Sequence, residues 1–195
     1  PIRKVTGEYG FNETFFTDAR IPESCLLGDE GGGWRMAMKT LENERGVIAG
    51  QASAHSMQSI GLEDLMNTMH DFERDGAPIL EDPMIRDELV KLAIEAKANS
   101  ISDRRAGIPA LNTDYPFGIA LSNKYRHTEF ARRMKQMGAH TQGAQGALFM
   151  DDDQAYQGGF WQRAYFANFG TTIGGGTTQI QANIIGEHVL GLPKS

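Results

Sequence analysis

The chain has 195 residues, a formal net charge of −6 and one cysteine, Cys25. This length predicts one domain, or one domain with an appendage, that buries a sizeable core. The acidic balance argues against a nucleic-acid-binding surface, and a lone cysteine cannot form an internal disulfide. No apolar run approaches the roughly 20 residues of a membrane span, so we expect a cytoplasmic protein with no membrane span.

The N-terminal region combines a short strand pattern with a glycine-rich loop. Aromatic residues on one face predict a strand over Phe11–Phe16, which ends before Ile21-Pro22. Residues Gly28–Gly33 read as a loop. The chain begins at Pro1, with no initiator methionine and no signal-peptide pattern, and its strand pattern begins almost at once. We therefore expect it to be a piece of a longer protein.

Helical spacing of apolar residues dominates the rest of the chain. It predicts one long helix over Trp34–Met69, followed by a helix that Asp82 caps and Pro83 begins. A break at Gly107–Pro109 precedes a third helix from Asp114 to Gly138, and a short helix follows over Phe160–Tyr165. Basic clusters such as Lys124–His127 have acidic neighbours, and we interpret them as solvated helix faces. The predicted fold is mainly α, an up-and-down four-helix-type bundle with a short N-terminal β segment.

A run of three glycines, Gly174–Gly176, precedes the last predicted helix. Glycine allows the backbone a positive φ and a close approach to a ligand. Thr178 and Gln181 have the spacing of a capping box, and apolar residues from Ile180 to Val189 continue with helical period. A glycine-rich turn at a helix start suits an anion, but a flexible turn before a capped helix has the same pattern.

One carboxylate, Glu44, is a candidate base because Leu41 and Ile48 lie one turn either side of it on the predicted helix. Burial in a cavity would raise its pKa into a useful range, whereas pairing with Arg45 would make it an ordinary surface charge. The five histidines have no helical pairing and no cysteine partner, so we predict no metal site. The Asp151–Asp153 run lacks the pattern of a calcium loop.

Several blocks, taken in order, resemble the C-terminal half of an acyl-CoA dehydrogenase. They are Phe15–Pro22, Leu27–Trp34, Asn43–Arg45, Ile173–Gln181 and Val189–Pro193. The resemblance implies that residues 1–28 are a remnant of the central β-domain with its linker, and that 29–195 form the C-terminal helical bundle.

The resemblance implies FAD-dependent α,β-dehydrogenation of an acyl-CoA thioester, a step of fatty acid metabolism. Many members carry the base just before the Gly-Thr of the last glycine turn, where this chain has Gly175. A minority carry it on the long helix before an arginine, and this position is Glu44. Glu44 is therefore the expected catalytic base, and electron-transfer flavoprotein the expected electron acceptor.

The resemblance also implies ligand contacts. Arg45 and Gly176 are expected to face the acyl-CoA. The residues expected to contact FAD, partly that of a neighbouring subunit, are Arg74, Gln142, Gly143, Gly146, Thr177, Thr178 and Gln179. The match at Arg74 and in the Gln142–Gly146 segment departs from the usual family pattern.

The family resemblance implies a homodimer or homotetramer, with a hetero-oligomer as the alternative. This chain by itself is expected to be inactive, since half of the flavin and CoA site would come from other segments. Two other functions stay open. The chain is a helical oligomerisation or interaction module without catalysis of its own, or it belongs to a flavin oxidase or monooxygenase of the same fold.

Overall fold

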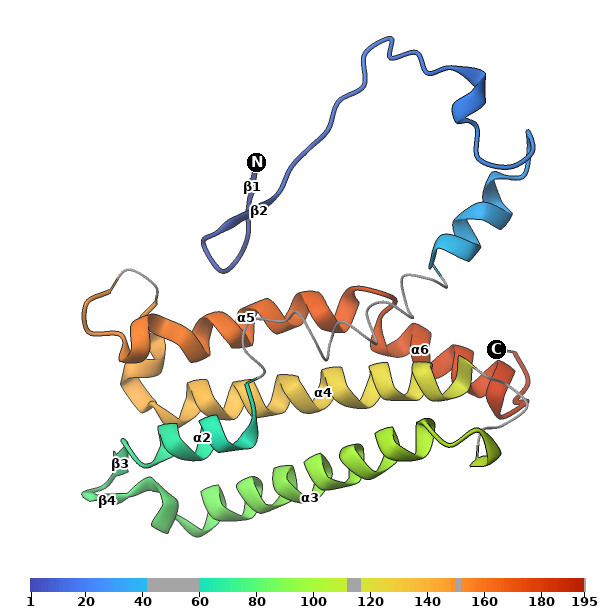
Figure 1. Cartoon of the computed structure of the whole chain (residues 1–195). Coiled ribbons are helices and arrows are strands. Elements are labelled where there is room, and N and C mark those ends of the chain that lie inside the picture. Colours follow the sequence, from blue (N-terminus) through green and yellow to red (C-terminus); the bar gives the residue numbers. More distant parts are fainter. Residues whose placement is uncertain (42–59, 112–116, 150–151, 195) are drawn as a thin grey trace.

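The computed structural model describes residues 1–41, 60–111, 117–149 and 152–194. Four helices run alternately up and down in one bundle (Figure 1). They are α2 (Leu62–Met69), α3 (Pro83–Ala106), α4 (Phe117–Thr141) and α5 (Phe160–Ile173). The helix α6 (Thr178–Ile184) follows and continues into a π-helical turn, Ile185–Val189. The predicted four-helix-type bundle is confirmed.

Short strands and 3-10 turns connect these helices. The hairpin of β3 (Glu73–Arg74) and β4 (Ala77–Pro78) joins α2 to the 3-10 turn Ile79–Glu81. Further 3-10 turns cover Pro109–Leu111, Gly143–Ala147 and Tyr156–Gly159. They lie before α4, after α4 and before α5, and the turn after α4 carries the predicted site residues Gly143 and Gly146.

The helix boundaries follow local chemistry where polar caps are present. Asp82 accepts hydrogen bonds from the backbone N–H groups of Met84 and Ile85, at 2.8 and 3.4 Å, and Pro83 is the first residue of α3. Gly107 ends the same helix. Both predicted boundaries are confirmed. α4 extends beyond the predicted Gly138 to Thr141, and α5 extends beyond Tyr165 to Ile173.

The prediction of one helix over Trp34–Met69 is wrong. Residues 33–41 are helical, but α2 begins afresh at Leu62. Gly61 has an extended backbone, with φ −107° and ψ 179°, and its N–H donates to Asp64 Oδ2 at 2.7 Å. The apolar spacing crosses this break because both segments have helical period, whereas the glycine and its acidic cap start a new helix. Residues 42–59 lie outside the described part.

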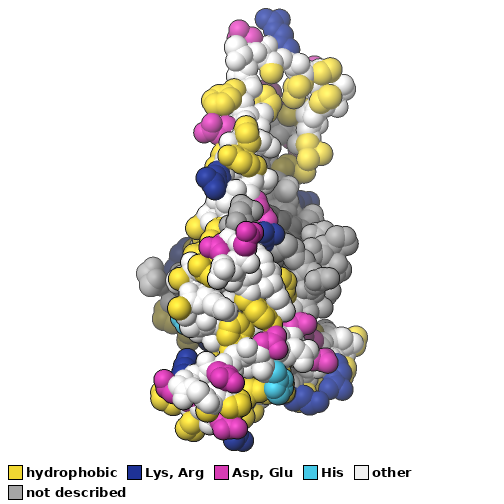
Figure 2. Space-filling view, turned by 90° about the vertical axis from the view of Figure 1, so that its left-hand side faces the viewer, with side chains coloured by type: hydrophobic (Ala, Val, Ile, Leu, Met, Phe, Trp, Pro, Cys, Tyr) yellow, Lys and Arg dark blue, Asp and Glu magenta, His cyan; other side chains and the backbone are white. Residues whose placement is uncertain are grey.

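The N-terminal strand is also displaced from its prediction. β1 (Ile2–Arg3) pairs antiparallel with β2 (Tyr9–Phe11), so the strand ends where the predicted one began. A 3-10 turn, Glu23–Cys25, follows. In Figure 1 the segment after β2 extends away from the bundle, and Figure 2 shows hydrophobic side chains gathered on this upper part. Phe15 and Phe16 are each 83% exposed, so among the described residues no strand covers these aromatic side chains.

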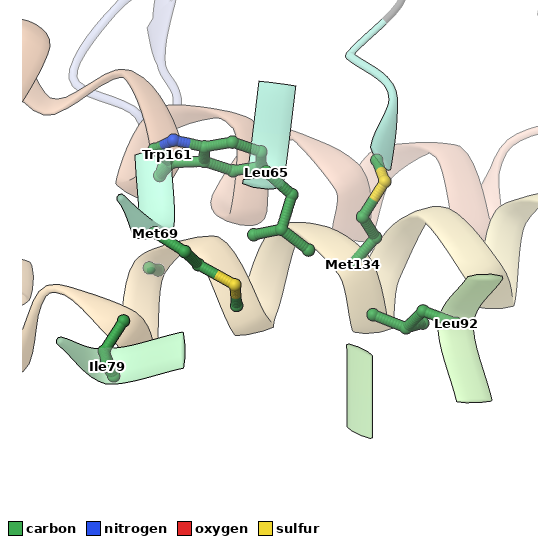
Figure 3. Packing of buried hydrophobic residues seen from close by; sticks show 7 residues of the cluster. Leu65, Met69, Ile79, Leu92, Met134 and Trp161 are labelled. Carbon is green, nitrogen blue, oxygen red and sulfur yellow. The ribbon is translucent and has the colours of Figure 1, made fainter. Parts of the chain in front are cut away.

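The hydrophobic core lies where α2, α4 and α5 meet, and the start of α3 closes it (Figure 3). Trp161 is fully buried, and its indole N–H donates to the hydroxyl of Thr68 at 2.8 Å. Gly138 of α4 lies directly against this ring, because a Cβ there would be 2.2 Å from a ring carbon of Trp161. The core cluster comprises Leu65, Met69, Ile79, Leu92, Met134, Ala139 and Trp161. This packing holds α4 and α5 side by side and so positions the loops at their ends.

Candidate active site

The glycine turn Gly174–Gly176 joins α5 to α6 (Figure 1). Gly175 and Gly176 have φ angles of 68° and 102°, in the region that favours glycine. A Cβ on Gly176 would lie 2.7 Å from the Nε2 atom of Gln181. The same Nε2 donates to the carbonyl of Gly175 at 2.7 Å. The turn therefore needs glycine for both its backbone angles and its packing, and it has a defined conformation.

The threonines after the turn have different roles from those that their spacing predicts. Thr177, and not Thr178, is the N-cap of α6, and its hydroxyl accepts from the N–H of Ile180 at 3.3 Å. Thr178 is the first residue of the helix and donates to Glu129 Oε1 of α4 at 2.7 Å. The predicted capping box of Thr178 with Gln181 is therefore wrong, because a carboxylate on α4 holds the Thr178 hydroxyl. Gln179 is exposed.

Two charged residues of α4 contact this turn region, and the sequence patterns had not singled them out. Lys124 Nζ donates to the carbonyls of Gly176 and Thr172, at 2.6 and 3.2 Å. Glu129 accepts from Thr178 and pairs with Arg132 at 3.1 Å. The interpretation of Lys124 as part of a solvated face is wrong, since it is only 7% exposed. Lys124 lies three residues after Leu121 and four before Thr128, on the predicted apolar face, and this spacing indicates that its side chain is buried.

The electrostatics of the two residues follow from their surroundings. Burial lowers the pKa of the Lys124 amine, and the nearby charge of Glu129 partly offsets this effect. The hydrogen bond from Thr178 lowers the pKa of Glu129, and Arg132 adds to this shift. Glu129 is thus held in its charged form, and its interaction with the start of α6 is a charge-assisted hydrogen bond.

A second group of predicted residues lies at the far end of α4. Gln142 is buried, donates to the carbonyl of Gly138 at 3.0 Å and accepts from Gln162 at 3.2 Å. Gly146 packs so closely that a Cβ would be 2.4 Å from the carbonyl oxygen of Ala139. Gly143, by contrast, has nothing within 4 Å of its Cβ position. The Gln142 side chain is therefore structural, whereas the backbone at Gly143 is accessible.

Two open grooves lie beside this second group. One, of about 310 Å³, is lined by His140, Gly143, Gly146 and Tyr165 among others. The other, of about 350 Å³, lies between α3 and α4 and includes Arg74 and again His140. Arg74 extends from β3 and forms an ion pair with Asp82 at 3.0 Å. Arg74 and the glycines thus border two grooves that share one histidine.

The predicted site residues fall into two separate sets. Thr177, Thr178 and Gln179 lie beside Glu129, whereas Gln142 follows the last turn of α4. At a rise of 1.5 Å per residue, the helix between Glu129 and Gln142 separates the two sets by about 20 Å. Glu44 and Arg45 lie outside the described residues. The residues predicted to contact ligands therefore lie on two separate surfaces of the chain.

The described residues also bear on metal binding and on membrane insertion. In this part of the chain, no three His, Cys, Asp or Glu side chains are grouped so that they could hold a metal ion. Within the same ranges, no helix is both long and apolar enough to cross a membrane.

Comparison with known proteins identifies the family. Residues 31–190 match the family model described as acyl-CoA dehydrogenase, C-terminal domain. The chain is 34% identical over its whole length to acyl-CoA dehydrogenase IpdE1 of Mycolicibacterium smegmatis, covering 45% of that protein. It is also 34% identical to IpdE1 of Mycobacterium tuberculosis, covering 47% of it. The chain belongs to the acyl-CoA dehydrogenase family and spans about half the length of these relatives.

Solved structures give the same fold. A structure described as "Tcur3481-Tcur3483 steroid ACAD" superposes with a TM-score of 0.74 at 23% identity, over 100% of this chain and 48% of that one. The ChsE4-ChsE5 complex from Mycobacterium tuberculosis superposes with a TM-score of 0.69 at 21% identity, over 93% and 46%. The bundle is thus the helical fold of these proteins.

Proposed function

We propose that this chain supplies the C-terminal part of an FAD-dependent acyl-CoA dehydrogenase, with Glu44 as the base that removes the α-proton of the thioester. Family membership across residues 31–190 carries the proposal. Residues 1–28 would then belong to the central β-domain, and residues 29–195 to the helical bundle. The relatives are about twice as long, so the remaining part of the site would come from segments outside this chain.

The geometry of the glycine turn supports a base on another element. By the family resemblance, Gly175 would occupy the position where many members carry the catalytic glutamate. Its φ of 68° is a left-handed value that strains a residue with a Cβ. The turn is also tightly packed at Gly176. The backbone here thus suits contacts with the substrate better than it suits a glutamate side chain, which leaves the proton transfer to Glu44.

The described residues fit a flavin at both of the surfaces identified above. In the described part of the chain, no acceptor takes the Thr177 hydroxyl proton, and Gln179 is exposed. Gly143 leaves its backbone open beside a groove, and Arg74 keeps 46% of its side chain exposed. Thr178 and Gln142 would contribute through their backbone, since their side chains are engaged within the chain. Bound FAD would supply the redox chemistry by accepting the β-hydrogen.

The residues of this chain would divide the remaining work. Glu44 would take the α-proton, and Arg45 would lie near the CoA. The backbone of Gly176 would lie against the thioester, held in place by the contacts of the turn. Electron-transfer flavoprotein would take the electrons, and fatty acyl thioesters of CoA would be the substrate class.

We further propose an oligomer, because the Gln142–Gly146 surface lies about 20 Å from the glycine turn and would meet the FAD of a neighbouring subunit. A homodimer or homotetramer is the simplest form. A hetero-oligomer is the alternative, since two of the structures with this fold are described by pairs of proteins. The mass of the purified complete enzyme in solution, with the chains identified by mass spectrometry, distinguishes these forms.

Replacing Glu44 by Gln in the complete enzyme tests the proposed base. We expect dehydrogenation to fall by about 10²–10⁴-fold while FAD stays bound, because an amide cannot accept the proton. Glu42→Gln, two positions earlier in the sequence, is the matched control and should keep its turnover. The measurement is the loss of the oxidised flavin absorption after an acyl-CoA is added, together with steady-state rates.

Retained turnover in Glu44→Gln would remove the assignment. If the wild-type enzyme binds FAD but no acyl-CoA reduces it, the chain is better described as a helical interaction module. Consumption of O₂ during turnover would indicate an oxidase of the same fold.

A further inference from the structure

Lys124 connects the end of α5 to the glycine turn. Its amine donates to Thr172 O, in the last turn of α5, and to Gly176 O, in the last residue of the turn. The last four carbonyls of a helix have no partner within the helix, and the negative end of the helix dipole favours a cation there. Lys124 therefore caps α5 with the same group that holds the turn.

Among the described residues, the other hydrogen bonds of the glycine turn run to α5 and α6. Gly174 donates to Gly170 O at 2.8 Å, and Gly176 donates to Ile173 O at 3.1 Å. Gln181, on α6, donates to Gly175 O. All of these partners lie on α5 and α6, the two helices that the turn joins. Next to the turn, Thr178 at the start of α6 donates to Glu129 of α4. Lys124 belongs to α4, which packs through Gly138 against the core residue Trp161.

A run of three glycines has more backbone freedom than three residues of any other type. Contacts with other parts of the chain are therefore needed to hold it in a single conformation. A lysine amine carries three N–H donors when charged and two when neutral, so it can serve both carbonyls in either state. Burial of the side chain keeps water from replacing it at these carbonyls. The restraint is therefore a hydrogen-bonded one and does not depend on the charge of the amine.

We propose that Lys124 is a positioning residue that fixes the glycine turn relative to α4, and that this sets the placement of Gly176 and Thr177 at the catalytic site. The structural half of this inference stands on the contacts above. The catalytic half rests on the proposed function, in which the turn lies between the thioester and the flavin. Lys124 itself would touch neither substrate nor cofactor.

The chain offers a matched control in Lys135. This residue is also on α4, and burial also lowers the pKa of its amine. It donates at 3.0 Å to the side chain of Asn168 in the middle of α5, and not to the turn. Lys124→Met and Lys135→Met therefore each remove one amine that donates toward α5 from the same helix, but only the first removes a contact with the turn.

Amide hydrogen exchange in the complete protein tests the structural half without any need for activity. In Lys124→Met we expect the Gly174 and Gly176 amides to exchange about tenfold faster than in the wild type, as loss of a hydrogen bond implies. In Lys135→Met their exchange should stay at the wild-type rate. Equal exchange of these amides in all three proteins, or acceleration spread evenly over the bundle in Lys124→Met, overturns the proposal.

If Lys124→Met does not fold, the same comparison is made with Lys124→Gln and Lys135→Gln. The glutamine side chain is more polar than methionine and shorter than lysine. Faster exchange at the turn in the first variant alone supports the proposal, and equal exchange in both overturns it.

Steady-state kinetics then test the catalytic half. We expect Lys124→Met to lower kcat about tenfold or more with a smaller change in KM, because a loosely held turn misplaces the reacting groups after binding. Lys135→Met should keep kcat within about twofold. Faster exchange at the turn with unchanged kcat removes the catalytic role and leaves the structural one. An inactive wild-type enzyme is a failure of the proposed function, and the exchange result still decides the role of Lys124.

Discussion

Helix α4 makes polar contacts on two sides, and the two sets differ in burial and in the nature of the partner. Toward α5, Lys135 is half-buried and donates to the neutral side chain of Asn168. Toward α3, Arg133 forms an ion pair with Glu95 at 2.5 Å, and these side chains are 47% and 29% exposed. The Lys135 contact thus joins a half-buried charge to a neutral partner, and the Arg133 contact joins two exposed, opposite charges.

This difference indicates which neighbouring helices hold α4 in position. Solvent screens the exposed pair, and two long side chains lose conformational freedom when they form it, so its net contribution is small. On the buried side, water cannot replace a lost hydrogen-bond partner, so each contact contributes more to the free energy of unfolding. We therefore expect α4 to be fixed mainly against α5 and α6, the elements that carry the glycine turn.

The largest expected effect comes from Gly138→Ala, on the buried side. Alanine normally stabilises a helix interior relative to glycine, but here the new Cβ would be 2.2 Å from the Trp161 ring. We expect a loss of about 1–3 kcal/mol in the free energy of unfolding, measured by urea denaturation, because α4 or the ring must shift.

Gly170→Ala is the matched control for this substitution. Gly170 lies in α5, and a Cβ there meets nothing within 4 Å. This variant should gain up to about 1 kcal/mol, since only the helix propensity changes. If both variants were stabilised by the same amount, the new Cβ at position 138 would be accommodated by a shift of α4 or of the Trp161 ring that costs no free energy.

A smaller effect is expected from Thr178→Val, which removes the hydrogen bond to Glu129 and keeps the shape of the side chain. We expect a loss of about 1 kcal/mol near neutral pH. Thr178 is the main cause of the lowered pKa of Glu129, so that pKa should rise toward its ordinary value of 4.5 in the variant. Carbon-detected NMR titration of the Glu129 carboxyl measures this shift.

The pH dependence of the Thr178→Val effect has a defined sign. A carboxyl whose pKa is lowered by folding stabilises the protein above its unfolded pKa, and this contribution is lost as the pH falls through the lowered value. The difference in stability between wild type and Thr178→Val should therefore shrink in acid. Thr171→Val removes a hydroxyl that donates to the carbonyl of Asn168, an uncharged acceptor, and its effect should not change with pH in this range.

Much of the bundle could be predicted from the sequence because its signals are local. Asp82 and Pro83 begin α3 through contacts within a few residues, and the apolar period of each helix shows which face is buried. The break at Gly61 was missed although its signal, a glycine followed by Asp64 at the right spacing, is also local. The helical spacing of apolar residues on both sides of Gly61 hides this signal, because it continues across the break.

The candidate site was less predictable because its contacts join distant segments. Whether Thr177 or Thr178 caps α6 depends on Glu129, which lies on another helix. Lys124 stands in a basic cluster that resembles a solvated face, and only the packing of α5 shows that carbonyls are available to hold its amine. The role of Glu44 stays a prediction, as this residue lies outside the described part.

The smallest effect is expected on the exposed side of α4, from Arg133→Gln. Removing the guanidinium breaks the pair with Glu95, and we expect a loss of at most about 0.5 kcal/mol that 1 M NaCl abolishes. A double-mutant cycle with Glu95→Gln isolates the coupling between the two side chains. A coupling above about 1 kcal/mol that persists in salt would mean that ion pairing also fixes α4 against α3. The contacts on the two sides of α4 would then stabilise the protein to a similar extent. Helix α4 would in that case be fixed against α3 as firmly as against α5 and α6, and its main role would not be to support the glycine turn.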